Sequence, residues 1–155
     1  MASSERPASD GFTSRRAGPP SGPSDVRSAP FGGATAGQAL GPAHYTVSAT
    51  ANERYWRAAG VDHPLLQAGR LYPPIAANLT ILLFQTVAPR PLLHARQQLR
   101  CHRLGQSGFE LTVAGHVTER FTKRGRDYAV VEAGIDLADG DRLWTSTATF
   151  CEVTP

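Results

Sequence analysis

An aspartate and a histidine stand side by side before a proline in the stretch "AAGVDHPLLQAG", which spans residues 58–69. Asp62 and His63 are residue types that transfer protons in enzymes when their surroundings tune them for it. A relocated acid/base pair is therefore one interpretation of this stretch. The alternative is an aspartate that stabilises a turn, followed by an exposed histidine before a proline. Turn chemistry alone favours this second, structural interpretation.

The segments on either side of this stretch are expected to be helices. Ser48 or Thr50 offers an oxygen for an N-cap, and Glu53 follows Thr50 at the capping-box spacing. Gly60 is placed to end this first helix. Residues 75–84 are apolar almost all round, which predicts a helix that is buried on all sides. The periodicity of this short apolar run does not by itself exclude a buried strand.

From Pro91 onward the apolar residues recur with a period of two, which is typical of strands. The alternating segments are residues 92–104, 109–121, 127–137 and 142–153. They are separated by "LGQSG", "KRGRD" and "ADGD", which contain glycine and have hairpin length. Long half-buried strands joined by tight turns predict an antiparallel meander. A sheet of this kind can curl around the apolar helix and cover it, so the expected fold class is α+β.

Composition divides the chain into two parts. Residues 1–43 are rich in proline, glycine and serine and poor in large apolar side chains. Such a segment cannot offset the cost of ordering its backbone, about 1–2 kcal/mol per residue. We therefore expect a disordered tail over residues 1–43 and one folded domain over residues 44–155. A secretory signal is disfavoured because the tail has no apolar run, and its acidic residues count against a transit peptide.

The charge balance and the cysteines exclude several classes of function. The chain has 16 Lys and Arg against 13 Asp and Glu, and no basic face interleaved with aromatic residues, so we expect no nucleic-acid partner. No segment approaches the ~20 apolar residues that cross a bilayer, so we expect no membrane partner. Cys101 and Cys151 are far apart and lack metal-ligand spacing. We therefore expect no metal site and a cytoplasmic location with reduced thiols.

The order of these segments resembles the N-terminal-type hot-dog domain of MaoC-like dehydratases. The stretch "YWRAAGVDHPL" is similar to the family's helix-to-loop passage, and "YPPIAANL" to its proline-marked entry into the central helix. The stretch "TERFTKRGRDYAVVEAGIDLADGDRLW" is similar to its two longest strands, joined by a "KRG" turn. The resemblance covers residues 45–153. It implies a single hot-dog fold, in which a long antiparallel sheet wraps around a central apolar helix.

The resemblance also implies an activity on acyl thioesters. Members of the family hydrate enoyl thioesters with (R) specificity, or dehydrate 3-hydroxyacyl thioesters, on CoA or on a carrier protein, and no other cofactor is implied. Their hot-dog domains act in pairs, and the thioester lies along the seam between them. One domain carries an Asp and a His in a "GDxNPxH" loop. Its N-terminal-type partner lacks both residues and shapes the acyl tunnel.

The catalytic residues of the family have no match in this chain. When the loop is aligned on Pro64, Val61 stands at the position of the reactive Asp and Leu66 at that of the His. Neither side chain can exchange protons. In catalytic members the start of the central helix presents an N–H group to the thioester oxygen. Here that start reads "YPPIA", and Pro73 and Pro74 have no N–H. The resemblance therefore implies a non-catalytic domain.

Within the resemblance, Tyr72, Asn78 and His94 are candidate substrate-binding residues. Tyr72 precedes the central helix, Asn78 lies inside it, and His94 opens the strand nearest the seam. The structural alternative for Asn78 is a core amide that has its own hydrogen-bond partner. Asp62 and His63 remain candidates for proton transfer, or for contacts to the pantetheine or phosphates of CoA.

Two arginines are candidates for binding a phosphate of CoA or an acidic carrier protein. Arg96 and Arg100 are separated by four residues on one predicted strand, so they lie on the same face of it. Their charges could attract such a group. The alternative is a solvated face of the strand.

Three functional hypotheses remain. In the first, the chain is a non-catalytic subunit of an (R)-specific enoyl-thioester hydratase or 3-hydroxyacyl-thioester dehydratase, paired with a catalytic hot-dog subunit; the active complex would be a hydro-lyase. In the second, the chain pairs with itself and is a hydratase, dehydratase or thioesterase that uses Asp62 or His63. In the third, it binds an acyl-CoA without turning it over. The acyl chain and the carrier stay open in each.

Overall fold

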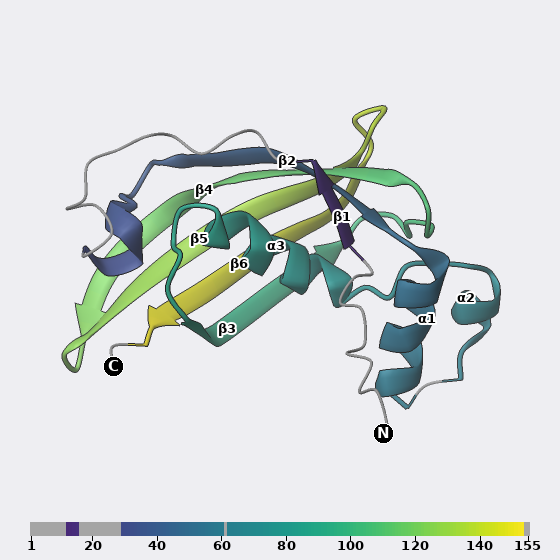
Figure 1. Ribbon diagram of the computed structural model, residues 1–155, viewed down its shortest axis with the longest axis horizontal. Coiled ribbons are helices and arrows are strands. Elements are labelled where there is room, and N and C mark those ends of the chain that lie inside the picture. The colour runs from purple at the N-terminus through teal and green to yellow at the C-terminus, as the bar shows by residue number, and fades with distance from the viewer. Residues whose placement is uncertain (1–11, 16–28, 61, 154–155) are drawn as a thin grey trace, which may run out of the picture.

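The computed structural model describes residues 12–15, 29–60 and 62–153, and shows one antiparallel sheet that curls around a helix (Figure 1). The elements are β1 (Phe12–Arg15), a short 3-10 turn η2 (Pro30–Gly33), β2 (Ala39–Val47), α1 (Ala49–Ala58), α2 (Pro64–Gln67), α3 (Ile75–Gln85), β3 (Leu92–Cys101), β4 (Glu110–Lys123), β5 (Arg126–Leu137) and β6 (Arg142–Glu152). Within the described ranges the sheet has six strands in the order β1-β2-β4-β5-β6-β3. The predicted α+β class and antiparallel sheet are confirmed.

The predicted meander is correct for two of its three connections. The turns between β4 and β5 and between β5 and β6 are hairpins, as their glycines predict. The stretch "LGQSG" is not a hairpin, because β3 pairs with β6 at one edge and β4 pairs with β2. The prediction was wrong there because turn residues indicate where the chain reverses, not which strands become neighbours.

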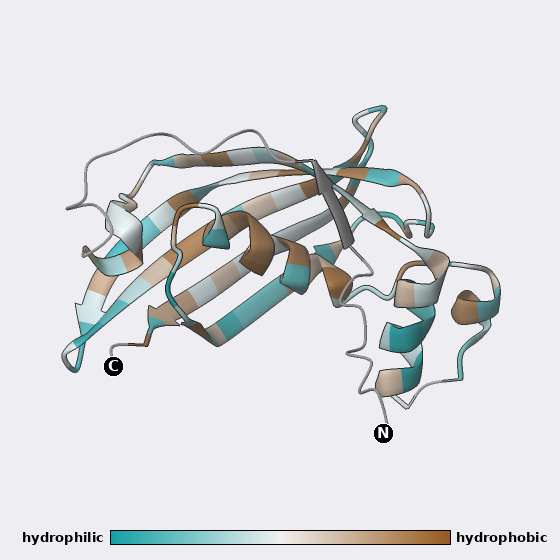
Figure 2. Cartoon of the chain, in the orientation of Figure 1, coloured by the Kyte–Doolittle hydropathy of each residue, from teal (hydrophilic) through white to brown (hydrophobic). Residues whose placement is uncertain are grey.

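Helix α3 packs on the concave side of the sheet and supplies much of the core. Its buried residues are Ile75, Ala76, Leu79, Thr80, Leu83 and Phe84. The opposite side of the helix, with Asn78, Ile81 and Leu82, is only half-buried. Figure 2 shows α3 largely in the hydrophobic colours on a sheet of mixed character. The helix is confirmed, but the prediction that it is covered on all sides is wrong, because the sheet covers one side only.

Helix α1 begins at one of the two caps that the sequence offers. The Ser48 side chain accepts a hydrogen bond from the Ala51 N–H at 3.1 Å, so Ser48 is the N-cap and Thr50 lies inside the helix. The capping box between Thr50 and Glu53 therefore does not form. Gly60 follows the last turn with a φ of +68°, which is the left-handed conformation expected of a glycine that ends a helix.

The folded domain begins before residue 44. Phe31 in η2 is fully buried, and its ring packs against that of Phe84 at 5.6 Å between centroids. Strand β2 starts at Ala39, so the expected boundary at residue 43 falls inside a strand. The boundary was placed too late because a segment poor in apolar residues still contributes two large side chains, Phe31 and Leu40, to the core. The rest of the expected tail, residues 1–11 and 16–28, lies outside the described residues.

Three side chains, those of Glu152, Arg90 and Arg120, hold η2 in place. The Phe31 N–H donates to the carboxylate of Glu152, which also forms an ion pair with Arg90 at 2.8 Å. The guanidinium of Arg120 lies 4.5 Å from the centroid of the Phe31 ring and donates to the Ala34 carbonyl. Phe31 itself has a φ of 53°, a left-handed conformation that is uncommon outside glycine. Packing therefore holds this residue in a conformation that its own backbone disfavours.

No helix of the described segments is long and apolar enough to cross a bilayer.

Candidate functional site

Two side chains of α1 fix the segment that leads into α3. Asn52, which is 2 % exposed, donates from Nδ2 to the Arg70 carbonyl at 2.8 Å and accepts from the Tyr72 N–H at 2.8 Å. Trp56, one turn further along, donates its indole N–H to the same Arg70 carbonyl at 3.0 Å. Because Asn52 and Trp56 are four residues apart, they share one face of the helix. The position of residues 70–72 is therefore set by α1.

His63 has a structural role in this arrangement. It is the N-cap of α2, and its Nδ1 accepts a hydrogen bond from the Leu65 N–H at 3.1 Å. Its ring stacks on that of Trp56, with 5.6 Å between centroids and 12° between planes. The lone pair of Nδ1 is thus already used, and the remaining nitrogen carries the proton in the neutral form. The structural interpretation made from turn chemistry is favoured by these contacts.

Asp62 lies apart from the apolar interior. Its side chain is exposed and forms no hydrogen bond or ion pair with His63 in the described part of the chain. It lines a shallow pocket of about 380 Å³ between α1, α2 and the loop before β4, where Glu53, Gln67 and Ser107 also contribute polar groups. An acid/base pair needs its two groups to be oriented toward one reacting atom. No contact in the described part of the chain orients the Asp62 side chain, and His63 Nδ1 is already engaged with the Leu65 N–H.

The entry to α3 offers no free donor for an oxyanion. Pro74 is the N-cap residue and makes no side-chain cap, and neither Pro73 nor Pro74 has an N–H. The next three N–H groups donate backward within the same turn, at 3.0–3.1 Å, to the carbonyls of Tyr72, Pro73 and Pro74. A helix start normally leaves such groups available to a ligand. Here the prolines remove two donors and the tight turn occupies the others.

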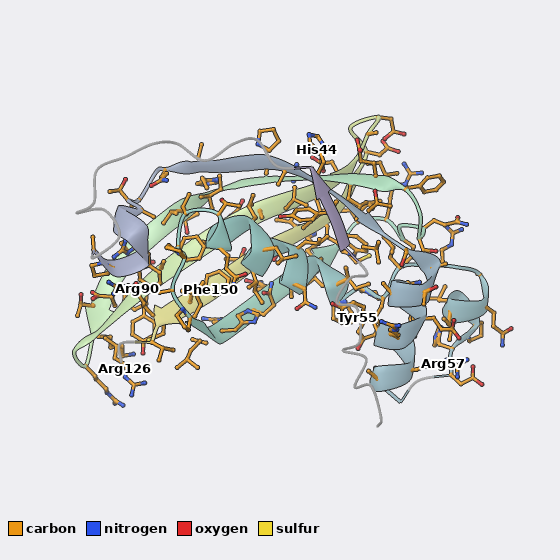
Figure 3. The ribbon with its side chains drawn as sticks, viewed as in Figure 1. His44, Tyr55, Arg57, Arg90, Arg126 and Phe150 are labelled. Atoms are coloured by element: carbon orange, nitrogen blue, oxygen red, sulfur yellow. The ribbon has the colours of Figure 1, made fainter. Side chains whose placement is uncertain are left out.

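The candidate residues Tyr72 and Asn78 are brought together by a residue that the sequence reasoning missed. Tyr55 of α1 stacks on Tyr72, with 6.4 Å between ring centroids, and its hydroxyl accepts a hydrogen bond from Asn78 Nδ2 at 2.9 Å. Figure 3 shows Tyr55 between α1 and α3. Asn78 is therefore an amide with its own hydrogen-bond partner, as the structural interpretation of this residue predicts, although it is only half-buried.

His94 lies at the other end of the central helix. Its ring contacts that of Phe150 at 5.4 Å, and Phe150 in turn stacks on Phe84 in the last turn of α3. Tyr72 and Asn78 flank the beginning of α3 instead. The three candidate substrate-binding residues are therefore divided between the two ends of α3, and they do not form one cluster.

Arg96 and Arg100 occupy the face of the sheet that points away from α3. They are exposed and pair across the strands with Thr149 and Thr145, while the alternate residue Leu99 packs toward the core. The prediction that both arginines share one face is consistent with this register. A phosphate bound to them would lie on the outer face, across the edge strand from any molecule that contacts α3.

A buried polar network between α3 and the two strands beside it was also missed by the sequence reasoning. The Thr80 hydroxyl lies 2.6 Å from Ser146 Oγ and 2.9 Å from the Ala76 carbonyl oxygen. Gln97 of β3 donates to Ser146 Oγ at 2.9 Å. The only sequence signal was that Gln97 and Ser146 stand at positions that face the core in an alternating pattern. Which polar residues meet there depends on the pairing of β3 with β6, which the sequence pattern does not provide.

Comparisons with known proteins identify the fold. No protein-family model and no curated protein sequence matches this chain. The structure of the HadBC (3R-hydroxyacyl-ACP dehydratase) complex from Mycobacterium tuberculosis matches with a TM-score of 0.65 and 16 % identity, over 75 % of this chain and 96 % of that chain. The chain is a hot-dog domain.

Two further structures agree with this. The R-hydratase PhaJ1 from Pseudomonas aeruginosa has a TM-score of 0.66 and 17 % identity, over 81 % of this chain and 86 % of that chain. A MaoC-like dehydratase from Rhodospirillum rubrum has a TM-score of 0.58 and 17 % identity, over 78 % and 94 % of the two chains. The resemblance to MaoC-like hot-dog proteins is thus confirmed at the level of the fold, which is what similarity at these identities shows.

Proposed function

We propose that this hot-dog domain is a non-catalytic subunit of an (R)-specific enoyl-thioester hydratase or 3-hydroxyacyl-thioester dehydratase. The observation that carries the proposal is the entry to α3, where no N–H group is free to receive a thioester oxygen. Oxyanion donors of this kind commonly lower an enzyme's barrier more than any other single contribution. The loop agrees with this, because His63 caps a helix and Leu66 cannot move a proton.

The place for a catalytic hot-dog partner is the seam surface, which we define as the half-buried side of α3 together with the core-facing residues of β3. Ile81, Leu82 and Leu99 supply its apolar area. Strand β3 is also the edge of the described sheet, with nine of its ten residues paired with β6 and no described strand on its other side. A long open edge beside an apolar helix face is a surface that proteins normally cover. In our proposal the partner covers it, and the acyl chain of a CoA or carrier-protein thioester lies in the seam.

Within this proposal Tyr72 and Asn78 contact the ligand near the beginning of α3, and His94 contacts it near the end. Arg96 and Arg100 attract the phosphate of CoA or an acidic carrier protein from the outer face of the sheet. No cofactor other than the thioester carrier takes part.

The test is hydration of a short enoyl-CoA by the purified chain, alone and mixed with a catalytic hot-dog protein encoded beside it. We expect activity in the mixture only, unchanged by Asp62→Ala and abolished when the loop aspartate of the partner is replaced. Turnover by this chain alone, lost in Asp62→Ala or His63→Ala, would instead establish the self-sufficient homodimer. Binding of acyl-CoA without turnover in either sample would establish the pure binding protein.

A further inference from the structure

Gln97, on the core-facing side of β3, has a buried side-chain oxygen without a hydrogen-bond partner among the described residues. Three buried side-chain atoms have no hydrogen-bond partner among the described residues: Gln97 Oε1, Arg120 Nε and Trp144 Nε1. The guanidinium of Arg120 is otherwise engaged with Phe31 and Ala34, and Trp144 is fully buried. Gln97 alone belongs to a half-exposed residue on the open edge strand. An unpaired acceptor at a surface that a ligand or partner covers calls for a donor from outside the chain.

The orientation of the Gln97 amide is fixed by its neighbours. Its nitrogen lies 2.9 Å from Ser146 Oγ and 2.9 Å from the Gln98 carbonyl oxygen. A carbonyl oxygen only accepts, so the atom facing it must be the nitrogen and not the oxygen. Both N–H groups of the amide are therefore used inside the chain. Flipping the amide would place two oxygens against each other, so the free group is an acceptor in any low-energy arrangement.

The amide is also rigidly supported from beneath. Ser146, which receives one of its N–H groups, is fully buried and lies 2.6 Å from the hydroxyl of Thr80 in α3. The network links the edge strand to the central helix, so Gln97 cannot turn toward solvent without breaking it. On its other side β3 has no further described strand.

We propose that Gln97 is a specificity-determining residue of the seam, whose side-chain oxygen accepts a hydrogen bond from a hydroxyl group on the bound acyl chain. This rests on the proposed function, because it takes an acyl thioester as the molecule in the seam. The apolar side chains of the seam surface, Ile81, Leu82 and Leu99, bind the hydrocarbon part and form no hydrogen bond with its polar groups. Gln97 then discriminates acyl chains that carry a hydroxyl group from acyl chains that carry none. The acceptor is already buried and unpaired in the free chain, so an acyl chain with a hydroxyl donor gains a hydrogen bond that a chain without one cannot form.

The experiment compares the affinities of three CoA esters for the full chain with its catalytic partner: octanoyl-CoA, 3-hydroxyoctanoyl-CoA and 8-hydroxyoctanoyl-CoA. We expect at least one hydroxylated ester to bind about 10-fold more tightly than octanoyl-CoA. Gln97→Met should remove this preference while leaving octanoyl-CoA binding intact. Gln98→Met changes the next residue, which points to the outer face, and serves as the matched control.

The outcomes separate this inference from the proposed function. If none of the three esters binds, the proposed function fails, and the inference fails with it. If the esters bind but with equal affinity, or if the preference survives in Gln97→Met, only the inference is overturned. A loss of partner binding in Gln97→Met, with the ester preference unchanged, would also overturn it, because the donor would then come from the partner subunit.

Discussion

His63 shows how a residue with catalytic potential can be committed to structure. Its Nδ1 caps α2 and its ring covers Trp56, which itself fixes the entry to α3 through the Arg70 carbonyl. A general base needs a nitrogen lone pair that faces the substrate. Asp62, its neighbour, is exposed and lacks an interaction that would orient it among the described residues.

Substitutions at these two positions should therefore separate stability from activity. We expect His63→Ala to lower the free energy of unfolding by about 1 kcal/mol, because it removes a cap and a ring contact. Urea denaturation measures this. Asp62→Ala, at the exposed neighbour, should stay within about 0.5 kcal/mol of the wild type. Hydration by the complex with the partner should change little in either variant. A loss of 100-fold or more would indicate proton transfer and would refute this assignment.

At the scale of single residues, the sequence identified side chains that cannot transfer protons. It did not predict which side chains form hydrogen bonds with distant residues. Valine and leucine at the expected catalytic positions, and two prolines before α3, are chemical facts that need no structure. Asn52, Tyr55 and Gln97 were not predicted, because their partners are distant in sequence and are brought near only by the packing of α1, α3 and the sheet. The same packing places Tyr72 and Asn78 at the beginning of α3 and His94 at its end.

The element with the least regular sequence, η2, is held by some of the most specific contacts. Its Gly32 has a φ of +63°, and a Cβ there would lie 2.2 Å from the Val87 carbonyl oxygen, so only glycine fits. Its Phe31 N–H donates a hydrogen bond to the buried carboxylate of Glu152, the last residue of β6. Helices and strands with a clear period could be predicted from the sequence. A turn of this kind could not, because its stability comes from distant residues and not from its own pattern.

Two substitutions of Glu152 test how η2 is held. Glu152→Ala leaves the buried Phe31 N–H without an acceptor, and we expect a loss of about 1–3 kcal/mol in the free energy of unfolding. Glu152→Gln keeps an oxygen at that position and should lose less. Both are measured by chemical denaturation at neutral pH. Equal losses in the two variants would show that the charge opposite Arg90 matters and that the Phe31 hydrogen bond does not.

The molecule as a whole is a sheet with two different edges. Strand β1 covers the outer side of β2 over four residues, while the outer side of β3 has no neighbouring strand among the described residues. The architecture was predictable from one apolar helix followed by alternating strands, because few arrangements bury both the helix and the apolar face of the sheet. The strand order was not, since the pairing of β3 with β6 joins segments that are distant in sequence.

Truncation locates the beginning of the folded domain. A chain that starts at residue 29 loses β1 but keeps the described core side chains, so we expect cooperative thermal unfolding. A chain that starts at residue 39 also loses Phe31 and Ala34 from the core. Removing a buried phenylalanine alone costs about 3–5 kcal/mol, a large part of the stability of a small domain. Thermal unfolding followed by near-ultraviolet circular dichroism should show no transition for this shorter chain. Equal melting temperatures would place the start of the domain near residue 39.

The position of β6 between β5 and β3 has a consequence for the newly made protein. On the ribosome β3 emerges roughly 50 residues ahead of the strand that pairs with it, which corresponds to about 3–10 s at ordinary rates of translation. During that interval its backbone groups on both sides are unpaired, and the apolar helix before it has no sheet to cover it. Its two arginines and three glutamines or histidines keep such a strand hydrated and disfavour contact with other nascent chains. The polar character of β3 thus protects the chain while it is being synthesised, before any partner can do so.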